Sequence, residues 1–558
     1  MTAIGHATPT TVSLWSRLYG FGSIFAKTVR DSRRATIVTG GILALVFIGV
    51  SRAITAEFDT PQSRAELENL VNSVPPILQG MAGKIVNVGT LGGYLQYKYG
   101  VFFPLVVSLW SILALSGTLA GEAQRGSLEF VAATGKSRRR VALEKLSGHV
   151  LMLGLAVLVA FASIAIAGST FATLPGDEIS VLSAFAYAVW LGLLALIAGA
   201  LAFALGPFVG RGAAAGISGF ITFAGFILNG YQGPVPELAP FANLTWWGWT
   251  YDHVALAGQY DWPSVALVAV VTVILLAIGI EAFARRDIGV TTALPTPSMP
   301  RRLLGLGGPV GRAISLSLSA AIAWGLGVGL FGLVLGSAAQ GFMEQLQDSP
   351  QFIELLSTAF PNVDYASAGG FLQLLFVEFG VILAGLAAAT FVSAWASDET
   401  SGRLEMVLAT PLSRARWAIA AGVGMLVNVG VFVALTAAGI GIGVATTTSN
   451  VATPLVGALV LGFYAVALAG IGLAVGGIVG TRFAATATVL FVIVTWFVQL
   501  LGALLNLPDV IRQLALTSHY GQPMVGVWDP VGIVASLVLA GGGVALGAWG
   551  FARRDLRN

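Results

Sequence analysis

The sequence contains no cysteine and only four histidines among its 558 residues. The absence of cysteine excludes disulfide frameworks, thiolate metal sites and cysteine nucleophiles. With so few histidines, a histidine-built metal centre is not expected either. No grouping of side chains suggests catalysis, so the sequence predicts no catalytic residue and no metal site.

Charge is scarce as well. Only 10% of the residues are charged and 56% are hydrophobic, whereas about 25% are charged in ordinary soluble domains. The mean hydropathy is +0.85, which means that far more apolar side chains are present than one compact core can bury. Because the apolar runs are continuous rather than alternating, the chain is predicted to be an all-α integral membrane protein.

Apolar runs long enough to cross a bilayer, which takes roughly 20 helical residues, occur twelve times along the chain. Six lie in the first half and six in the second. The predicted spans are 35–54, 101–120, 146–169, 181–206, 213–229, 263–284, 313–337, 371–397, 418–445, 454–480, 484–503 and 530–550.

The positions of lysine and arginine predict the topology. Placing the N-terminus in the cytoplasm puts all but five of the 29 basic residues on the cytoplasmic side, as the positive-inside rule requires. Segment 338–370 carries acids and no basic residue, so it is expected to face outward. The first apolar run lacks a small-residue cleavage site, so it is expected to be an uncleaved span. Both termini are then cytoplasmic.

The chain contains an internal repeat. Residues 126–140 align with 402–416, and residues 283–287 align with 551–555 in the same order. Each half holds six predicted spans, so the two halves are predicted to be parallel six-helix repeats. The predicted domains are 1–312 and 313–558.

The longer repeat lies in two predicted cytoplasmic loops, 121–145 and 398–417. Each loop begins with acid, continues through a glycine into a short amphipathic helix, and then has a helix stop, a serine cap and arginines. A loop that is simply exposed to the cytoplasm would explain the arginines, but it would not explain the rest of the pattern. The duplicated apolar stripe instead predicts a helix that inserts into a groove on another protein. The residues that carry the pattern are Glu122, Gly126, Leu128, Glu129 and Val131 in the first loop, and Asp398, Glu399, Gly402, Leu404, Glu405, Val407, Leu408, Pro411, Ser413 and Arg414 in the second.

This pattern resembles the cytoplasmic loop of the type-2 exporter permeases of ATP-binding-cassette (ABC) transporters. The second copy matches the family closely, whereas the first has Gly135 where the family has proline and carries one acid instead of two. The length, the twelve spans and the fused halves look like actinobacterial permeases grouped with polyketide-antibiotic and multidrug exporters. The resemblance implies a type-2 ABC exporter fold in a bacterial plasma membrane. It also implies that both segments are coupling helices, so we call 121–145 and 398–417 the first and second coupling loops.

The resemblance further implies a motor on a separate polypeptide. Two copies of a nucleotide-binding subunit are expected to bind ATP and magnesium, while this chain holds no cofactor and is not an enzyme. Residues 134–137 look like the tail of a phosphate-binding loop, but Phe130 stands where that loop needs glycine. The other expected partners are membrane lipid and a hydrophobic drug, metabolite or lipid substrate, with no nucleic acid.

Other classes of function remain as alternatives. A proton-coupled secondary transporter also commonly has twelve spans, but it needs intramembrane acids or histidines. Glu378 is the one carboxylate well inside a predicted span. It either has a functional role on a substrate path, or it lies at the water boundary or bonds a neighbouring helix. A scaffold or membrane enzyme has no catalytic grouping to support it. Glycine runs inside the spans predict close helix packing rather than nucleotide binding.

Segments outside the spans also carry expectations. Residues 14–34 are predicted to form an interfacial elbow helix, with a weaker equivalent at 303–316. The long outer segments 55–100 and 338–369 are predicted to be lids or interfacial helices. Segments 230–262 and 506–529 are expected to contain short re-entrant helices, one of them anchored at the membrane interface by tryptophans: Trp246, Trp247 and Trp249.

Overall fold

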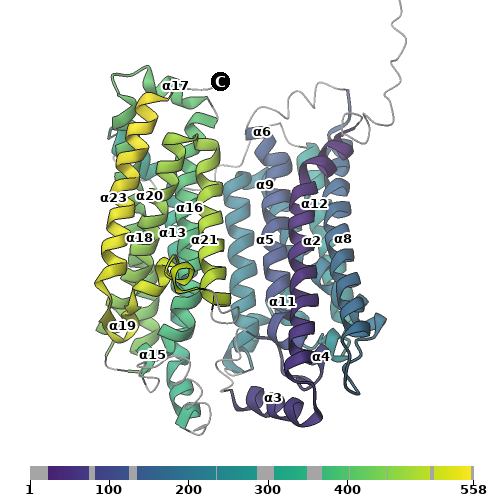
Figure 1. Cartoon of the computed structure of the whole chain (residues 1–558). Helices are drawn as coiled ribbons and strands as arrows, with labels where there is room; N and C mark the ends of the chain where they lie inside the picture. The colour runs from purple at the N-terminus through teal and green to yellow at the C-terminus, as the bar shows by residue number, and fades with distance from the viewer. Residues whose placement is uncertain are drawn as a thin grey trace, which may run out of the picture. The chain divides into compact units, whose positions relative to one another are not determined.

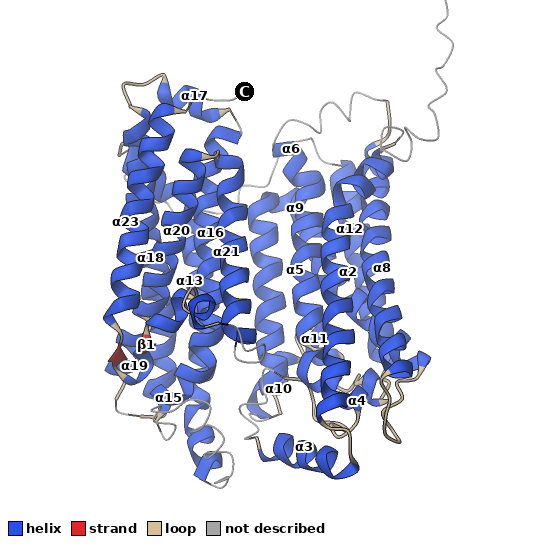
Figure 2. Cartoon of the chain, in the orientation of Figure 1, coloured by secondary structure: helices blue, strands red, loops and turns tan. Residues whose placement is uncertain are grey.

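The computed structural model is almost entirely helical (Figure 2). It describes residues 23–74, 82–124, 135–233, 236–285, 307–347, 367–400, 402–448, 450–502 and 508–554. These residues divide into two compact units, one within Met1–Val74 and Gln79–Leu294 and the other mainly within Pro295–Asn558. The all-α membrane fold expected from composition is confirmed.

In the first unit, five long helices provide most of the structure, and shorter helices join them. Helix α2 packs against α8, α5 against α9, and α9 against α12. The described elements are α2 (Ile24–Glu57), α3 (Pro61–Ser73), α4 (Leu91–Leu95), η2 (Gln96–Gly100), α5 (Phe102–Ser116), η3 (Gly117–Gly121), α6 (Glu122–Gln124), α8 (Arg138–Thr170), α9 (Val181–Tyr231), η4 (Pro236–Leu238), α10 (Ala239–Ala242), α11 (Trp246–Trp249), η5 (Ala255–Ala257) and α12 (Trp262–Arg285).

The second unit repeats this order of pairing. Helix α13 packs against α18, α16 against α20 and α21, and α20 against α23. A two-residue antiparallel ribbon, in which Gly521 pairs with Trp528, precedes the last helix. The described elements are α13 (Pro309–Gln347), α15 (Ala368–Leu372), η7 (Gln373–Val377), α16 (Glu378–Thr400), α17 (Arg403–Leu408), α18 (Arg414–Ala445), α19 (Ala452–Gly457), α20 (Leu459–Ile478), α21 (Thr481–Gly502), α22 (Asp509–Arg512), η8 (Leu516–His519), β1 (Gly521–Gln522), η9 (Pro523–Val525), β2 (Val527–Trp528) and α23 (Pro530–Arg553).

Ten helices among the described residues are long and apolar enough to cross a membrane. Helix α9 contains two of the expected spans, separated by a break at Gly210 three residues after Pro207. Gly210 has a φ of +79°, a backbone conformation that glycine adopts without a steric penalty. Helix α21 has a shorter apolar part, Thr481–Trp496. With α9 counted as two segments and α21 added, each of the twelve expected spans lies in a described helix.

The expected elbow helices are not separate elements within the described residues. Helix α2 runs without interruption from Ile24 to Glu57, and α13 from Pro309 to Gln347. The basic residues at 27–34 therefore extend the first span by about two turns instead of lying on a second helix. Their positive charge indicated a position near the lipid headgroups and therefore a separate interfacial helix. Charge alone does not end a helix, and residues 27–34 contain no proline or capping residue that would end it. Residues 14–22 and 303–306 lie outside the described part.

The tryptophans of the segment between α9 and α12 correct another expectation. Trp246 and Trp247 are 5% and 1% exposed, so they are buried in the first unit rather than placed at a lipid interface. Trp247 packs edge-on against Phe226 of α9 at 5.5 Å. The short helices expected there are present as α10, α11 and η5, and they are held to the unit by these aromatic rings.

Glycines allow two helix pairs of the second unit to approach very closely. A Cβ on Gly439 of α18 would lie 2.1 Å from the carbonyl oxygen of Gly329 in α13. A Cβ on Gly477 of α20 would lie 2.2 Å from the carbonyl oxygen of Gly547 in α23. In lipid, helices associate through such backbone proximity because burial of apolar side chains gives little extra driving force. The prediction that glycine runs serve packing is confirmed for α13 and α18, whereas the contact between α20 and α23 was not predicted.

We expect Gly439→Val to destabilise the second unit, because the added side chain must displace the α13 backbone. Overpacking of this kind costs about 1–3 kcal/mol or more. Thermal unfolding in detergent should show a lower midpoint than for the unsubstituted chain. The matched control is Gly430→Val on the same helix, where a Cβ meets nothing within 4 Å. Equal midpoints for the two variants would contradict the packing role.

Candidate functional site

The second coupling loop forms a short helix between two long ones. After α16, Gly402 adopts a φ of +72° and leads directly into α17 (Figure 1). Ser413 then caps α18 by accepting a hydrogen bond from the backbone N–H of Arg416 at 3.3 Å. A glycine entry, a short helix and a serine cap are therefore all where the sequence predicts them. Pro411 lies in the turn between α17 and α18, as expected of a residue that ends a helix.

The apolar stripe of α17 faces the protein rather than the solvent. Leu404 is 1% exposed, and Val407 and Leu408 are half-buried. Leu404 therefore packs toward its own unit in the described structure, and its assignment as a residue that couples to an ATPase stays a prediction. The exposed side chains of α17 are Arg403, Glu405 and Met406, and Met406 is 68% exposed.

The two acids that begin the loop are engaged inside the unit. Asp398 is completely buried and forms an ion pair with Arg312 of α13 at 2.9 Å. Arg403 of α17 lies 3.7 Å from the same carboxylate. Because a buried carboxylate is costly without a partner, Asp398 fixes the end of α16 to the start of α13 and to α17.

Glu399 makes the second connection. It accepts hydrogen bonds from Arg554, which follows α23, at 2.8 Å and from the Thr481 hydroxyl at 2.6 Å. Arg414 of α18 donates to the backbone carbonyl of Arg554 at 2.7 Å. The end of α16 is thereby joined to the end of α23 and to the starts of α18 and α21.

Three aromatic rings lie on the same helices. Trp395 of α16 stacks on Trp417 of α18 at 5.1 Å, and Trp417 lies 4.8 Å from Phe551 of α23. All three side chains are at most 5% exposed. Aromatic contacts and charge pairs therefore hold α16, α18 and α23 together near α17.

Beside α17 the surface is hollowed. The hollow has a volume of about 480 Å³ and includes both an acid and a base in its lining. Since Glu405 lines it and Met406 is exposed next to it, this face of the second coupling loop offers charge and an apolar side chain to an external group. The lining residues are Glu405, Leu408, Ala409, Leu412, Ser413 and Arg414.

In the first coupling loop an acid also forms ion pairs within its unit, but its partners are lysines instead of arginines. Glu122 lies 2.6 Å from Lys145 of α8 and 3.7 Å from Lys27 near the start of α2. Ser137 caps α8 by accepting from the N–H of Arg140 at 3.3 Å, as Ser413 does for α18. In each unit, therefore, an acid after the second predicted span meets a base at the start of the unit's first long helix. Four predicted residues lie outside the described residues: Gly126, Leu128, Glu129 and Val131.

Glu378 occupies a special position in its helix. It is the first residue of α16 and directly follows the π-helical turn η7. Its side chain is half-buried. Since π-helical turns often occur at functional sites, this location keeps Glu378 as a candidate for the substrate path. The structure does not bring it together with the coupling loop residues.

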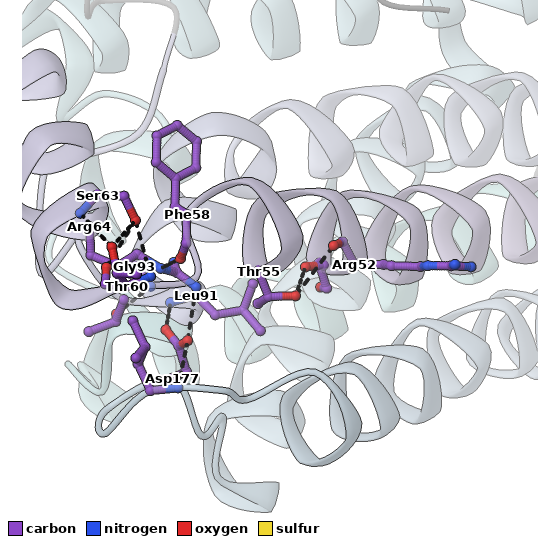
Figure 3. Close-up of polar contacts among 12 residues, drawn as sticks. Arg52, Thr55, Phe58, Thr60, Ser63, Arg64, Leu91, Gly93 and Asp177 are labelled. Atoms are coloured by element: carbon purple, nitrogen blue, oxygen red, sulfur yellow. Dashed lines mark hydrogen bonds and ion pairs between the residues drawn. The ribbon is translucent and has the colours of Figure 1, made fainter.

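A buried ion pair at the other end of the first unit was not found by sequence reasoning. Arg64 of α3 donates to Asp177 in the α8–α9 connection at 2.9 Å, and Asp177 also accepts from the N–H of Leu91 at 2.9 Å (Figure 3). Burial lowers the pKa of Arg64 below its usual value, and the Asp177 carboxylate offsets only part of this shift. The pair fixes α3 and the start of α4 to one connection. Residues 113 positions apart give no local pattern that predicts such a contact.

Metal ligation has no support in the described part of the chain, where no group of three or more histidine, aspartate or glutamate side chains is arranged to hold an ion.

Comparison with known proteins gives two matches. Residues 306–552 match the family model for "Multidrug efflux system permease Rv1217c, C-terminal domain". The chain is also 27% identical over 320 residues to "Multidrug efflux system permease protein Rv1217c" of Mycobacterium tuberculosis (strain ATCC 25618 / H37Rv). That alignment covers 56% of this chain and 56% of the relative, so the match spans little more than half the relative's length. Both findings confirm the resemblance to exporter permeases drawn from the coupling loops.

We expect Asp398→Asn to be far more destabilising than Glu405→Gln. The first change leaves Arg312, whose side chain is 36% exposed, beside a neutral group at a fully buried position, a loss of about 1–3 kcal/mol. The second alters an exposed side chain and should change stability by about 0.5 kcal/mol or less. Thermal unfolding of both variants in the same detergent checks the difference. Equal midpoints would show that the buried pair does not hold the second coupling loop.

Proposed function

We propose that this chain is the permease subunit of an ATP-driven exporter that moves hydrophobic drugs, secondary metabolites or lipids out across a bacterial plasma membrane. Its termini and coupling loops are cytoplasmic in this proposal. Two copies of a nucleotide-binding subunit, one beneath each half, bind ATP and magnesium and hydrolyse the ATP. The similarity to a multidrug efflux permease supports the class of protein.

The connections of α17 are the observation that carries the proposal. Helix α17 presents Glu405 and Met406 outward, while Asp398 and Glu399 just before it are paired to Arg312 and Arg554. A displacement of α17 by a partner subunit is therefore transmitted to the ends of α13 and α23. A short helix that is fixed to its own unit by its apolar stripe, and that presents exposed side chains on its other face, is suited to contact a groove of another protein.

The arrangement also suggests how the two halves couple to their motors. In the first unit the motif acid is neutralised by Lys145 and Lys27, and Arg139 of α8 pairs with Glu281 of α12 at 2.8 Å. Each coupling loop is thus linked to the first and last helices of its own unit, but through different residues. Both halves then respond to closure of the nucleotide-binding subunits, but the ion pairs that transmit the movement involve different residues in the two halves.

Purification of the tagged chain from its native host in mild detergent tests the partner. We expect two copies of a P-loop ATPase for each copy of this chain, measured by quantitative mass spectrometry. Transport into inverted vesicles should require ATP. If the chain is isolated alone and transport follows a proton gradient without ATP, the permease proposal is wrong and Glu378 becomes the group to study.

Charge reversal on α17 tests the coupling surface. In vesicles containing the chain and its ATPase, Glu405→Arg combined with Met406→Glu should lower substrate-stimulated ATP hydrolysis at least tenfold. The reason is that the proposed contact with the ATPase then loses its matching charge at 405 and its apolar side chain at 406. The amount of the variant inserted in the membrane should equal that of the unsubstituted chain. A matched control is Arg482→Gln, an exposed residue in the first turn of α21, which should leave stimulation unchanged. Unaltered stimulation in the double variant would refute the assignment of α17 as a coupling helix.

A further inference from the structure

A second duplicated element lies at the opposite end of each unit from α6 and α17 (Figure 1). Residues 90–96 read Thr-Leu-Gly-Gly-Tyr-Leu-Gln, and residues 367–373 read Ser-Ala-Gly-Gly-Phe-Leu-Gln. We call these two stretches the GGQ segments. Each comprises a hydroxyl residue, a one-turn helix and a glutamine that begins a π-helical turn, η2 in the first unit and η7 in the second.

The GGQ segments begin with the same cap. The Thr90 hydroxyl accepts a hydrogen bond from the N–H of Gly93 at 3.1 Å, and the Ser367 hydroxyl accepts from the N–H of Gly370 at 3.1 Å. These bonds satisfy a donor that the start of a helix leaves free. The duplicated sequence therefore encodes a duplicated local structure.

Each GGQ segment rests on a loop that leads into the last helix of its unit. These return loops, residues 253–261 and 521–529, share a glycine with positive φ, Gly258 or Gly526, followed three residues later by an aspartate. That aspartate, Asp261 or Asp529, accepts a backbone hydrogen bond at the start of α12 or α23. The return loops thus correspond to each other as the GGQ segments do.

Glutamine joins the two elements in both units. The Gln96 side-chain oxygen accepts from the N–H of Leu256 at 3.2 Å, and the Gln373 side-chain oxygen accepts from the N–H of Met524 at 3.1 Å. Leu256 and Met524 are 4% and 0% exposed. These two residues lie in the one-turn helices η5 and η9, and the first N–H groups of a helix have no partner within it. A buried N–H costs free energy if it is left unpaired, so the glutamine supplies the acceptor.

Glycine makes this contact possible. A Cβ on Gly92 would lie 2.2 Å from the carbonyl oxygen of Leu256, and a Cβ on Gly369 would lie 2.3 Å from that of Met524. The same loop residue therefore meets the glycine with its carbonyl and the glutamine with its N–H. Any larger side chain at either glycine would separate the loop from the helix.

The side chains within the two π-helical turns differ although the connection is the same. The first turn contains Tyr97, Lys98 and Tyr99, whereas the second contains Leu374, Leu375 and Phe376. The shared residues are those that join the segment to its return loop. This difference indicates that the connection is a mechanical requirement of both halves and not a feature of one binding surface.

We propose that Gln96 and Gln373 are positioning residues that lock each GGQ segment to its return loop, so that the two move as one rigid body about the adjoining π-helical turn when the export path opens. The movement rests on the proposed function, whereas the lock rests on the hydrogen bonds alone. A π-helical turn suits a hinge because its irregular hydrogen bonding marks a local departure from the regular helix. In the first unit Asp177, which accepts from the N–H of Leu91, extends the rigid body to α3.

Backbone amide exchange on the purified full chain, read by mass spectrometry, tests the lock. Gln96→Met keeps the side chain's length and removes the acceptor, so exchange in a peptide covering 253–261 should accelerate at least tenfold. Gln373→Met should do the same for 521–529 and leave the first loop unchanged. Gln96→Glu, which keeps an acceptor oxygen, should restore most of the protection. Unchanged exchange in both methionine variants would overturn the lock.

Matched controls remove other buried side-chain bonds to show that the effect is local. Ser108→Ala removes a bond to the carbonyl of Leu194 at 3.2 Å, and Ser317→Ala removes one from Asn428 at 2.7 Å. Neither contacts a return loop in the described structure, so neither should accelerate exchange there. If the serine variants accelerated exchange in the return loops as much as the methionine variants do, the effect would be general destabilisation and the specific lock would be refuted.

Transport per ATP hydrolysed tests the movement. With the ATPase subunit present, Gln96→Met and Gln373→Met should each lower this ratio several-fold while ATP hydrolysis persists, a separation that loss of folded protein does not produce. An unchanged ratio together with accelerated exchange would refute a role in export and retain the lock. Absence of ATP-dependent transport by the unsubstituted chain would instead refute the permease role, and the exchange data would stand apart from it.

Discussion

Buried charge pairs at the ends of apolar helices are the constraint on which the rest of this structure depends. An unpaired carboxylate in such surroundings costs several kcal/mol, so the position of Asp398 determines where Arg312 and the start of α13 lie. Glu122 joins α8 through the buried Lys145, and it also lies near Lys27, a more exposed residue at the start of α2. Helices that lipid alone would not align are thus held in register by a few charges.

Glycine and charge have complementary parts in this arrangement. The charge pairs act at helix ends, where the chain leaves the apolar region, and the glycines act along the helix faces. Gly329 and Gly439 bring α13 and α18 together, and the start of α13 is also joined to the end of α16 through Asp398. A displacement at α17 therefore reaches closely packed helices that have little free volume to absorb it.

The sequence predicted the features that depend on local pattern. Continuous apolar runs identified the twelve spans, and the glycine, proline and serine of residues 402–413 identified α17 and the cap of α18. The surface against which an apolar helix face packs was harder to predict. An amphipathic stripe shows that Leu404 is buried somewhere, but it does not distinguish a partner's groove from the chain's own unit. Contacts between distant residues, such as Arg64 with Asp177, leave no periodic signal, and the GGQ segments are too short for hydropathy to reveal.

Each unit contains both members of its own charge pairs. Lys27, Glu122 and Lys145 belong to the first, and the second unit has Arg312, Asp398, Glu399 and Arg554. Neither set needs a covalent connection between the halves to become neutral. A chain cut between 286 and 306 and produced as two polypeptides would therefore keep every one of these pairs within one polypeptide or the other.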